Sequence, residues 1–458
     1  MRIAAKERNG VSTTLARVIV SCADGGQMRA LAARLSACGY VTLSVPPGAA
    51  ALRLVREARP DLVVVGAEED SARAVALAEG IKQSTETRHI PIAVLVRQAS
   101  PTLRRACLAV GIDDVITGAV PDPVLTARLA PLFRLATMTG ELTRRRDTLR
   151  VMGLAGSSAG SVTLDTRPAS VLIMASGAAQ GEGPAIGRAL AEDCVLSYSP
   201  DPFSVAEALN GNRFDALVLL PDSDIERALH LCSHIRNNPR LFNLPVLLVA
   251  DRASFDDPTI PYRRGASLVL TRPFDAAELR DQVQSLVRRQ RLRQAVRDAL
   301  AAMLDERTRD PETGLYAQAF LAAHLSRLVA DAGLSQKPLS VVLLEIQNIA
   351  WFERQFGPAA GARVLGQVAR WLQGLVRIED LAAHVKDARF AIVLPDTGED
   401  DALVVANRIA GVLLHTNFMV EDAPDADALR VWVEAGTAMA EPGDTVDSLL
   451  ARAHSRLR

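Results

Sequence analysis

The sequence is poor in aromatic residues and in cysteine, and its charges almost balance. Aromatic residues make up 4% of its 458 residues, and the formal net charge is −1. No long basic run occurs, so the sequence gives no electrostatic reason to expect binding to nucleic acid or to a membrane surface. No apolar run reaches the roughly 18 to 20 residues that a membrane-spanning helix needs. We therefore expect neither a nucleic-acid partner nor a membrane span.

The cysteines and histidines show no metal-ligand spacing. The five cysteines are scattered among apolar neighbours, at positions Cys22, Cys38, Cys107, Cys194 and Cys232. This scatter favours buried, reduced thiols over a disulfide framework. Residues 1–14 are polar and lack the apolar core of a signal peptide. We expect a cytoplasmic protein without a bound metal ion.

What is present is a globular composition and an internal repeat. Apolar residues make up 49% and charged residues 23% of the chain, and its length suggests two to four domains. Short β-branched runs alternate with helical patterns, and the candidate strands of the first repeat are 17–21, 62–65, 91–96 and 114–117. The same order recurs, with candidate strands at 171–174, 216–220, 245–249 and 268–271. This alternation predicts parallel sheets covered by helices on both faces.

The pattern divides the chain into five segments. Residues 15–138 and 168–293 are predicted to be two doubly wound α/β domains, and residues 310–458 a third α/β domain. Residues 139–167 are basic at Arg144 to Arg146 and then rich in Gly and Ser, which predicts a helix end followed by a flexible linker. Residues 294–309 continue a helical pattern from Leu279 into the third domain.

The two repeats resemble response-regulator receiver domains, which have a flavodoxin-like fold. The first repeat carries motifs where receivers place them: Arg59-Pro60-Asp61, His89-Ile90-Pro91 and Gly111-Ile112-Asp113-Asp114. The second carries Gly265-Ala266-Ser267 before its last strand. A phosphorylated receiver has an acidic pair for Mg²⁺, an Asp acceptor, a hydroxyl and a Lys.

The resemblance places other residues at those positions. In the first repeat they are Cys22 and Ala23 for the acidic pair, Gly66 for the acceptor, Val96 for the hydroxyl and Gly118 for the Lys. A shift of one or two residues would restore part of the site through Asp24 or through Glu68, Glu69 and Asp70. In the second repeat the acceptor, hydroxyl and Lys positions hold Leu220, Ala250 and Arg272, with Asp222 and Asp224 just beyond the strand. We expect no phosphoacceptor, and expect the receivers to serve as packing and docking surfaces that form a homodimer through their fourth and fifth helices.

The third domain resembles the GGDEF family of diguanylate cyclases. It opens at Asp310-Pro-Glu-Thr-Gly-Leu-Tyr316, and two apolar runs flank the polar pair Lys386-Asp387, as in a tight β-hairpin. The resemblance places the family signature at that turn, where only the last residue is retained: Lys386, Asp387, Ala388, Arg389 and Phe390.

The same resemblance implies that the catalytic positions are lost. The two metal-binding carboxylates fall on Glu345 and Ala388, and the two guanine-binding residues fall on Glu353 and Ala362. Side chains replace the signature glycines where the triphosphate must approach the backbone. Because loss of a two-metal clamp removes this catalysis, we expect no enzyme activity. Lys386 leaves GTP binding without turnover as an alternative.

A second family motif is retained five residues before the signature. Many members bind cyclic di-GMP through Arg-x-x-Asp, which is present as Arg377 and Asp380, and through a further Arg that falls on Arg408. A guanidinium can donate to guanine or phosphate, and a carboxylate can accept from guanine N–H groups. The alternative is a surface ion pair beside a solvated arginine. A further arginine that clamps the ligand in PleD-like members falls on Asp331, so another clamp, or none, is expected.

The domain order resembles PleD-like response regulators and, with its lost catalytic residues, their noncatalytic PopA-like relatives. That resemblance implies a bacterial cyclic di-GMP receptor in cell-cycle signal transduction. It also implies recruitment to a cell pole and an adaptor role in regulated proteolysis, with a further adaptor, the ClpXP protease and a cell-cycle regulator as partners. A ligand-independent dimeric scaffold and a residual diguanylate cyclase are the alternatives.

Overall fold

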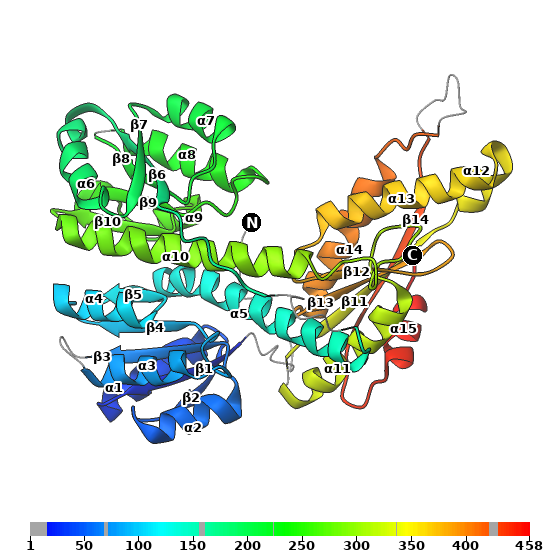
Figure 1. Ribbon diagram of the computed structural model, residues 1–458, viewed down its shortest axis with the longest axis horizontal. Helices are drawn as coiled ribbons and strands as arrows, with labels where there is room; N and C mark the ends of the chain where they lie inside the picture. The colour runs from blue at the N-terminus through cyan, green and yellow to red at the C-terminus, as the bar shows by residue number, and fades with distance from the viewer. Residues whose placement is uncertain (1–15, 68–71, 155–160, 223, 336, 421–428) are drawn as a thin grey trace. The chain divides into compact units, whose positions relative to one another are not determined.

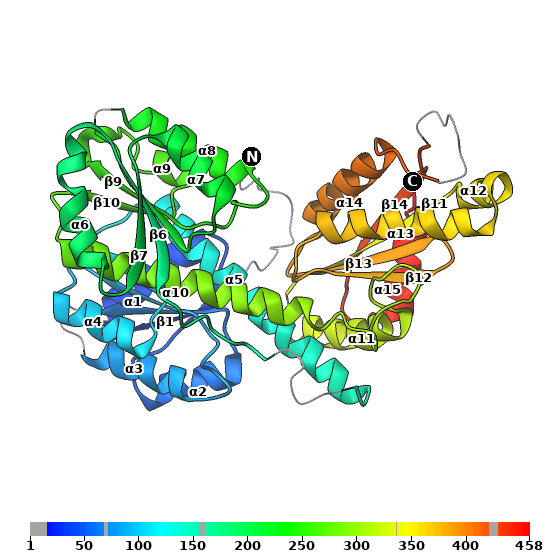
Figure 2. The same ribbon diagram turned by 45° about the horizontal axis from the view of Figure 1, so that its top comes forward.

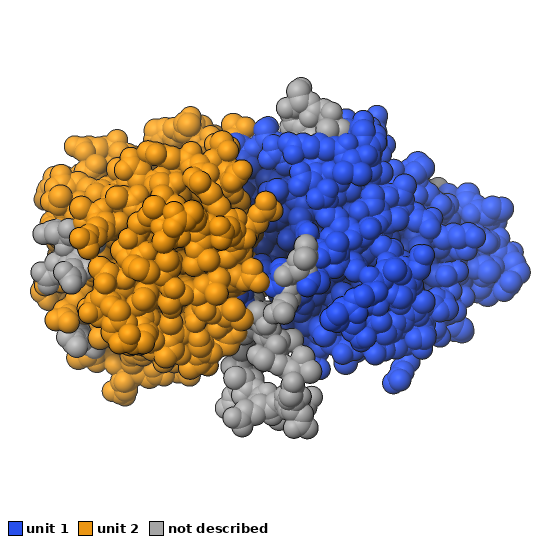
Figure 3. Space-filling view, turned by 90° about the horizontal axis from the view of Figure 1, so that it is seen from below, with its two compact units in different colours: residues 1–16, 137–162, 296–458 blue, residues 17–136, 163–295 orange. Residues whose placement is uncertain are grey.

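The computed structural model describes residues 16–67, 72–154, 161–222, 224–335, 337–420 and 429–458. The chain forms two compact units, which Figure 3 distinguishes by colour. Unit 2 contains residues 17–136 and 163–295, and unit 1 contains residues 1–16, 137–162 and 296–458. Glu68, Glu69 and Asp70, the acidic residues of the shifted receiver alignment, lie outside the described residues. No helix in the described ranges is long and apolar enough to cross a membrane.

The first repeat of unit 2 is a parallel five-stranded sheet in the order β2-β1-β3-β4-β5. Its strands are β1 (Arg17–Cys22), β2 (Val41–Ser44), β3 (Leu62–Ala67), β4 (Ile92–Val96) and β5 (Asp114–Thr117). Its helices are α1 (Gly25–Ala37), α2 (Ala49–Ala58), α3 (Ala72–Gln83), α4 (Pro101–Val110) and the first part of α5 (Asp122–Val151). Alternate strand residues pack on opposite faces, with Ile19 in the core beneath α2 and α3 and Val18 in the core beneath α1 and α5. This is the doubly wound arrangement that the sequence predicts.

The second repeat has the equivalent strand order, β10-β9-β8-β6-β7. Its strands are β6 (Ala169–Ala175), β7 (Cys194–Ser199), β8 (Ala216–Leu220), β9 (Val246–Asp251) and β10 (Leu268–Arg272). Its helices are α6 (Gly183–Leu190), α7 (Pro202–Gly211), α8 (Ile225–Asn237), α9 (Ile260–Arg264) and α10 (Ala276–Ala301), with short 3-10 turns at Gly177–Gly181 and Arg252–Ser254. Figure 1 shows the helices on both sides of each sheet. Strands β2 and β7 were not predicted, because both are edge strands without a continuous buried apolar run.

Within unit 2, helix α10 of the second repeat contacts α4 and the residue just before β5 of the first. Ser285 donates to the Asp113 carbonyl at 3.0 Å, and Arg288 donates to the Leu108 carbonyl at 2.8 Å. Arg104 lies 3.6 Å from both Glu278 and Asp281. Part of the surface on which we expected receiver dimerisation is therefore in contact with the same chain, and the homodimer stays a prediction.

The third domain, in unit 1, is an antiparallel sheet in the order β12-β13-β11-β14. Its strands are β11 (Leu339–Ile346), β12 (Leu381–Lys386), β13 (Arg389–Pro395) and β14 (Val433–Met439). Its helices are α11 (Gln318–Ser335), α12 (Ile349–Phe356), α13 (Pro358–Leu375), α14 (Glu399–Leu414) and α15 (Val446–His454). Figure 2 shows α13 and α14 on one face of the sheet and α11 and α15 on the other. The largest core lies under α12, α13 and α14 and includes Phe352 and Phe390.

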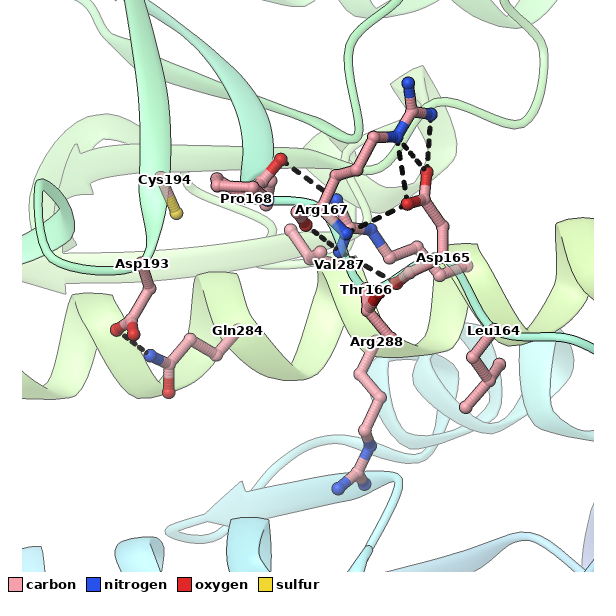
Figure 4. A pocket seen from close by; sticks show the side chains of 12 residues that line it. Leu164, Asp165, Thr166, Arg167, Pro168, Asp193, Cys194, Gln284, Val287 and Arg288 are labelled. Carbon is pink, nitrogen blue, oxygen red and sulfur yellow. Dashed lines mark hydrogen bonds and ion pairs between the residues drawn. The ribbon is translucent and has the colours of Figure 1, made fainter.

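Residues 139–167 begin with the predicted helix end, but the last residues of the predicted linker are held against helix α10. Helix α5 continues without a break to Val151, and residues 137–162 belong to unit 1 rather than to the receivers. At the other end, Arg291 on α10 binds the carbonyls of Asp165, Arg167 and Pro168 beside a cavity of about 430 Å³ (Figure 4). The helix predicted from Leu279 through residues 294–309 ends earlier, because α10 stops at Ala301.

Candidate functional site

The signature residues lie at the turn between β12 and β13. The turn is formed by Asp387 and Ala388, one residue later than predicted, and Lys386 pairs with Arg389 across it. Asp387 has a φ of 53°, in the left-handed region that glycine favours. His384 binds the Asp387 carbonyl through Nε2 at 2.9 Å and lies 3.1 Å from Asp310 through Nδ1. These contacts tie the turn to the opening motif of the domain.

The side chains at the turn cannot form the family's acidic site. Ala388 packs against the domain core, and its carbonyl accepts from the N–H of Ile346 at 3.0 Å. Glu345 faces Arg389 across the sheet, with 4.0 Å between the carboxylate and the guanidinium. Glu345 is thus the one carboxylate at the two predicted metal positions. No group of three or more His, Cys, Asp or Glu residues suited to a metal ion occurs in the described part of the chain.

The two predicted guanine-recognition positions lie where α12 and α13 meet. Glu353 is exposed on α12, and its side chain lies against Gly361, where an added Cβ would come 2.7 Å from the Glu353 Cγ. Ala362 follows on α13 and offers no hydrogen-bonding side-chain atom. The pair therefore offers one carboxylate, on Glu353, and no second hydrogen-bonding side chain for guanine.

The Arg377–Asp380 turn joins the end of α13 to the start of β12. The Asp380 carboxylate accepts from the Arg377 N–H at 2.8 Å, and the Asp380 N–H donates to the Arg377 carbonyl at 3.1 Å. The turn is thus closed by its own first and last residues. Asp380 is 7% exposed, whereas the Arg377 side chain is exposed. In the described part of the chain, Asp380 therefore contacts the backbone of Arg377 and forms no ion pair with the Arg377 guanidinium.

Helix α14 brings Arg408 to the same place. Its Nη2 donates to the Leu375 carbonyl at the end of α13, at 2.9 Å, two residues before Arg377. The structure therefore brings together all three predicted ligand-binding residues, Arg377, Asp380 and Arg408. Asp331, the predicted clamp position, lies on α11, and its carbonyl accepts from Ser335.

Burial changes the proton affinity of the turn's acid. Loss of hydration on burial raises the pKa of Asp380 to about 7. The Arg377 N–H opposes this shift, the Glu379 charge adds to it, and the charges of Arg377 and Arg145 oppose it. Asp380 is therefore close to half-ionised at neutral pH.

A residue that the sequence did not identify as functional contacts this turn. Arg145, on the part of α5 that belongs to unit 1, donates to the carbonyls of Glu379 and Asp380, both at 3.0 Å. The only sequence signal was the basic run at Arg144 to Arg146, which also fits a solvated helix end. Spacing along the chain cannot relate Arg145 to residues more than 230 positions away.

The residues at the predicted receiver-site positions of the first repeat also come together in space. Cys22, Gly66, Val96 and Gly118 line one cavity of about 520 Å³ at the carboxyl end of the first sheet. The Cys22 thiol fills the space beside Gly66, since an added Cβ would lie 2.3 Å from its sulfur. Burial raises the pKa of this thiol. Asp24, the nearest acid of the shifted alignment, caps α1 by accepting from Gln27.

The second receiver has a different polar group at the equivalent edge. Leu220 and Ala250 are buried in the sheet, at 0% and 2% exposure. Arg272 forms an ion pair with Glu182 at 3.0 Å and also donates to the Pro221 carbonyl. Asp224 caps α8, so it has a structural role.

Comparison with known proteins agrees with this architecture. Residues 307–458 match the family described as diguanylate cyclase, GGDEF domain. The response regulator PleD of Caulobacter vibrioides is 28% identical over 440 residues, which cover 96% of this chain and 95% of PleD. The diguanylate cyclase TpbB of Pseudomonas aeruginosa is 30% identical over 115 residues, 25% of this chain and 26% of TpbB.

Among solved structures, the GGDEF domain of DgcB from Caulobacter crescentus, in complex with c-di-GMP, matches 33% of this chain and 85% of its own. Its sequence identity is 20% and its TM-score is 0.31. Residues 307–458 thus match the GGDEF family, and along nearly its whole length the chain is similar to the response regulator PleD.

Proposed function

We propose that the protein is a noncatalytic cyclic di-GMP receptor. The observation that carries the proposal is a contrast within one domain: Arg377, Asp380 and Arg408 lie together, whereas the catalytic positions hold Ala388 and Ala362. The first set offers two guanidinium groups and a carboxylate. The second leaves one carboxylate at the metal positions, Glu345, and one at the guanine positions, Glu353, each beside a methyl group where the chemistry needs a second ligand.

The side chains of the Arg377–Asp380 turn suit a guanine dinucleotide with two phosphates. The exposed Arg377 can donate two parallel hydrogen bonds to a guanine edge or to a phosphate. Asp380, once ionised, accepts from guanine N–H groups, and the free nitrogens of Arg408 add a second cation beside it. Such charge-assisted bonds are worth about 1.5–3 kcal/mol each.

Titration calorimetry with cyclic di-GMP tests the proposal. We expect micromolar or tighter binding, about −8 kcal/mol or better, by the full-length protein. Arg377→Ala is expected to abolish the measurable heat. Arg354→Ala removes an exposed arginine from α12 and is the matched control, expected to bind as the unaltered protein does. Absence of binding by the unaltered protein would leave a ligand-independent scaffold.

We propose that the GGDEF domain has no cyclase activity. A two-metal mechanism needs two carboxylates at the positions of Glu345 and Ala388, and one is a methyl group. Incubation with GTP and Mg²⁺ or Mn²⁺ is expected to yield no cyclic di-GMP by chromatography. Product formation that is lost in Glu345→Ala would contradict this part of the proposal.

We further propose that the bound form acts as an adaptor through its receivers. The support is the similarity to PleD and the absence of the usual phosphoacceptor residues at Gly66 and Leu220. By family resemblance the partners are a further adaptor, the ClpXP protease and a cell-cycle regulator, at a cell pole. Recruitment of these partners that persists unchanged after removal of either receiver would contradict this role.

A further inference from the structure

A buried charged cluster in unit 1 has no part in the function described so far. It consists of Glu141 and Arg145 on α5, His324 on α11 and Tyr316 at the start of the GGDEF domain. Glu141 and His324 are 0% exposed, and Arg145 is 2% exposed. Burying charged groups costs several kcal/mol per ion unless each is paired and hydrogen-bonded. Such a cluster therefore needs an explanation in its contacts.

The contacts pair every charge in the cluster. Arg145 Nε donates to Glu141 Oε1 at 2.7 Å, and His324 Nε2 lies 2.8 Å from the same oxygen. Burial opposes ionisation of Glu141, but His324 and Arg145 outweigh it and hold the pKa of Glu141 well below its usual range. Thr148 Oγ1 lies 3.0 Å from His324 Nδ1. The carboxylate thus fixes the Arg145 guanidinium in one orientation.

The other nitrogens of Arg145 point at the GGDEF domain. Nη1 donates to the Tyr316 hydroxyl at 3.3 Å, and the guanidinium carbon lies 5.4 Å from the centre of that ring. Nη2 donates to the carbonyls of Glu379 and Asp380. A planar guanidinium makes all these bonds together, whereas an ammonium group on a lysine stem cannot.

The two carbonyls are the link to ligand binding. They belong to the last residues of the Arg377–Asp380 turn, whose N–H and carboxylate groups close on Arg377. Holding these carbonyls limits how far the Asp380 side chain and the Arg377 backbone can shift. A binding site held in its bound geometry loses less entropy when the ligand arrives.

We propose that Arg145 is a positioning residue for the Arg377–Asp380 turn, so that docking of α5 residues 137–151 and cyclic di-GMP binding favour each other. The ligand part of this inference rests on the proposed function. The coupling is reciprocal: the docked helix raises affinity for the ligand, and the ligand strengthens docking of the helix.

Calorimetry on full-length variants tests the effect on affinity. Arg145→Lys keeps the charge beside Glu141 but loses the fork, and we expect its Kd for cyclic di-GMP to rise at least about tenfold. Arg144→Ala is the matched control. Arg144 also contacts Glu141, at 3.3 Å, but not the turn, so its Kd should stay within about twofold. An Arg145→Lys protein that melts at a lower temperature with an unchanged Kd would show a merely structural role and overturn the inference.

Hydrogen exchange supplies a readout that does not need the ligand. In Arg145→Lys, backbone amides of residues 377–381 should exchange faster than in Arg144→Ala, because the carbonyls are released. In the unaltered protein, cyclic di-GMP should slow exchange over residues 141–151. If the unaltered protein does not bind, the proposed function fails, and the exchange comparison alone decides whether Arg145 holds the turn. Equal exchange in the two variants would refute it.

Discussion

The turns at the two ends of strand β12 differ in which family residues they retain. At its start, the Arg377–Asp380 turn keeps its charged groups, is closed by its own hydrogen bonds and is held from behind by Arg145. At its end, the signature turn exposes Lys386 and Asp387 and buries Phe390. The hairpin therefore folds with other residues at most signature positions, because the residue that packs into the core is the aromatic one. The exposed residues set the chemistry of this turn, whereas the buried aromatic residue sets its packing.

The largest expected effect concerns packing at the signature end. Phe390 is fully buried in the main core of the domain, so Phe390→Ala should cost about 3–5 kcal/mol of unfolding free energy. All three tryptophans, Trp351, Trp371 and Trp432, lie in this domain, so their fluorescence in a urea titration follows its unfolding. Its partly exposed neighbour Arg389 serves as the control, and Arg389→Ala should lower the unfolding free energy by less than about 1 kcal/mol. A similar small cost for Phe390→Ala would contradict the packing argument.

The next effect is the pH dependence of binding at the other end. With a pKa of about 7, the ionised fraction of Asp380 increases about tenfold between pH 6 and pH 8. Since guanine N–H groups need an acceptor, cyclic di-GMP affinity should increase by about that factor as pH rises. Calorimetry at several pH values measures it, and Asp380→Asn should remove the dependence. A flat profile in the unaltered protein would mean that Asp380 does not contact the ligand in its ionised form.

A smaller effect distinguishes the two arginines of the proposed binding site. Arg408 already donates to the Leu375 carbonyl, whereas the Arg377 side chain is exposed, so Arg408 has fewer nitrogens to offer. Arg408→Ala should weaken binding about fivefold, about 1 kcal/mol. Calorimetry beside Arg377→Ala compares them directly. Equal losses of affinity in the two variants would show that Arg408 leaves the Leu375 carbonyl and binds the ligand as strongly as Arg377 does.

The smallest effect concerns the conformation of the signature turn. Asp387 has a positive φ, so Asp387→Gly relieves backbone strain while increasing the freedom of the unfolded chain. These two effects oppose each other, so the unfolding free energy measured in urea titrations should change by less than about 1 kcal/mol. The affinity for cyclic di-GMP should not change. The adjacent Lys386→Gly, in a strand, should cost about 0.5–1 kcal/mol. A large loss of cyclic di-GMP affinity in Asp387→Gly would show that the signature turn affects ligand binding at the Arg377–Asp380 turn.

Most of the fold could be predicted from sequence periodicity. The eight candidate strands of the two repeats all appear as strands, and the six that lie inside the sheets are buried almost throughout, so they read as apolar runs. Periodicity missed β2 and β7 at the sheet edges, where one side is solvent. The hairpin turn was placed one residue too early, since polarity marks a turn region but not its backbone angles. The helix end at Arg144 to Arg146 was predicted, but not the buried Arg145–Glu141 ion pair, because a solvated basic run and a buried ion-pair cluster have the same composition.

The sequence by itself determined most of the elements, the residue types at the signature positions and the three candidate ligand-binding residues. These properties depend on residue types at short spacings along the chain. Only the tertiary structure decided that Arg408 lies beside Arg377, that burial raises the pKa of Asp380, and that Arg145 holds the turn between them. Those properties depend on which distant segments pack together, and packing removes water from some charged groups and leaves others exposed.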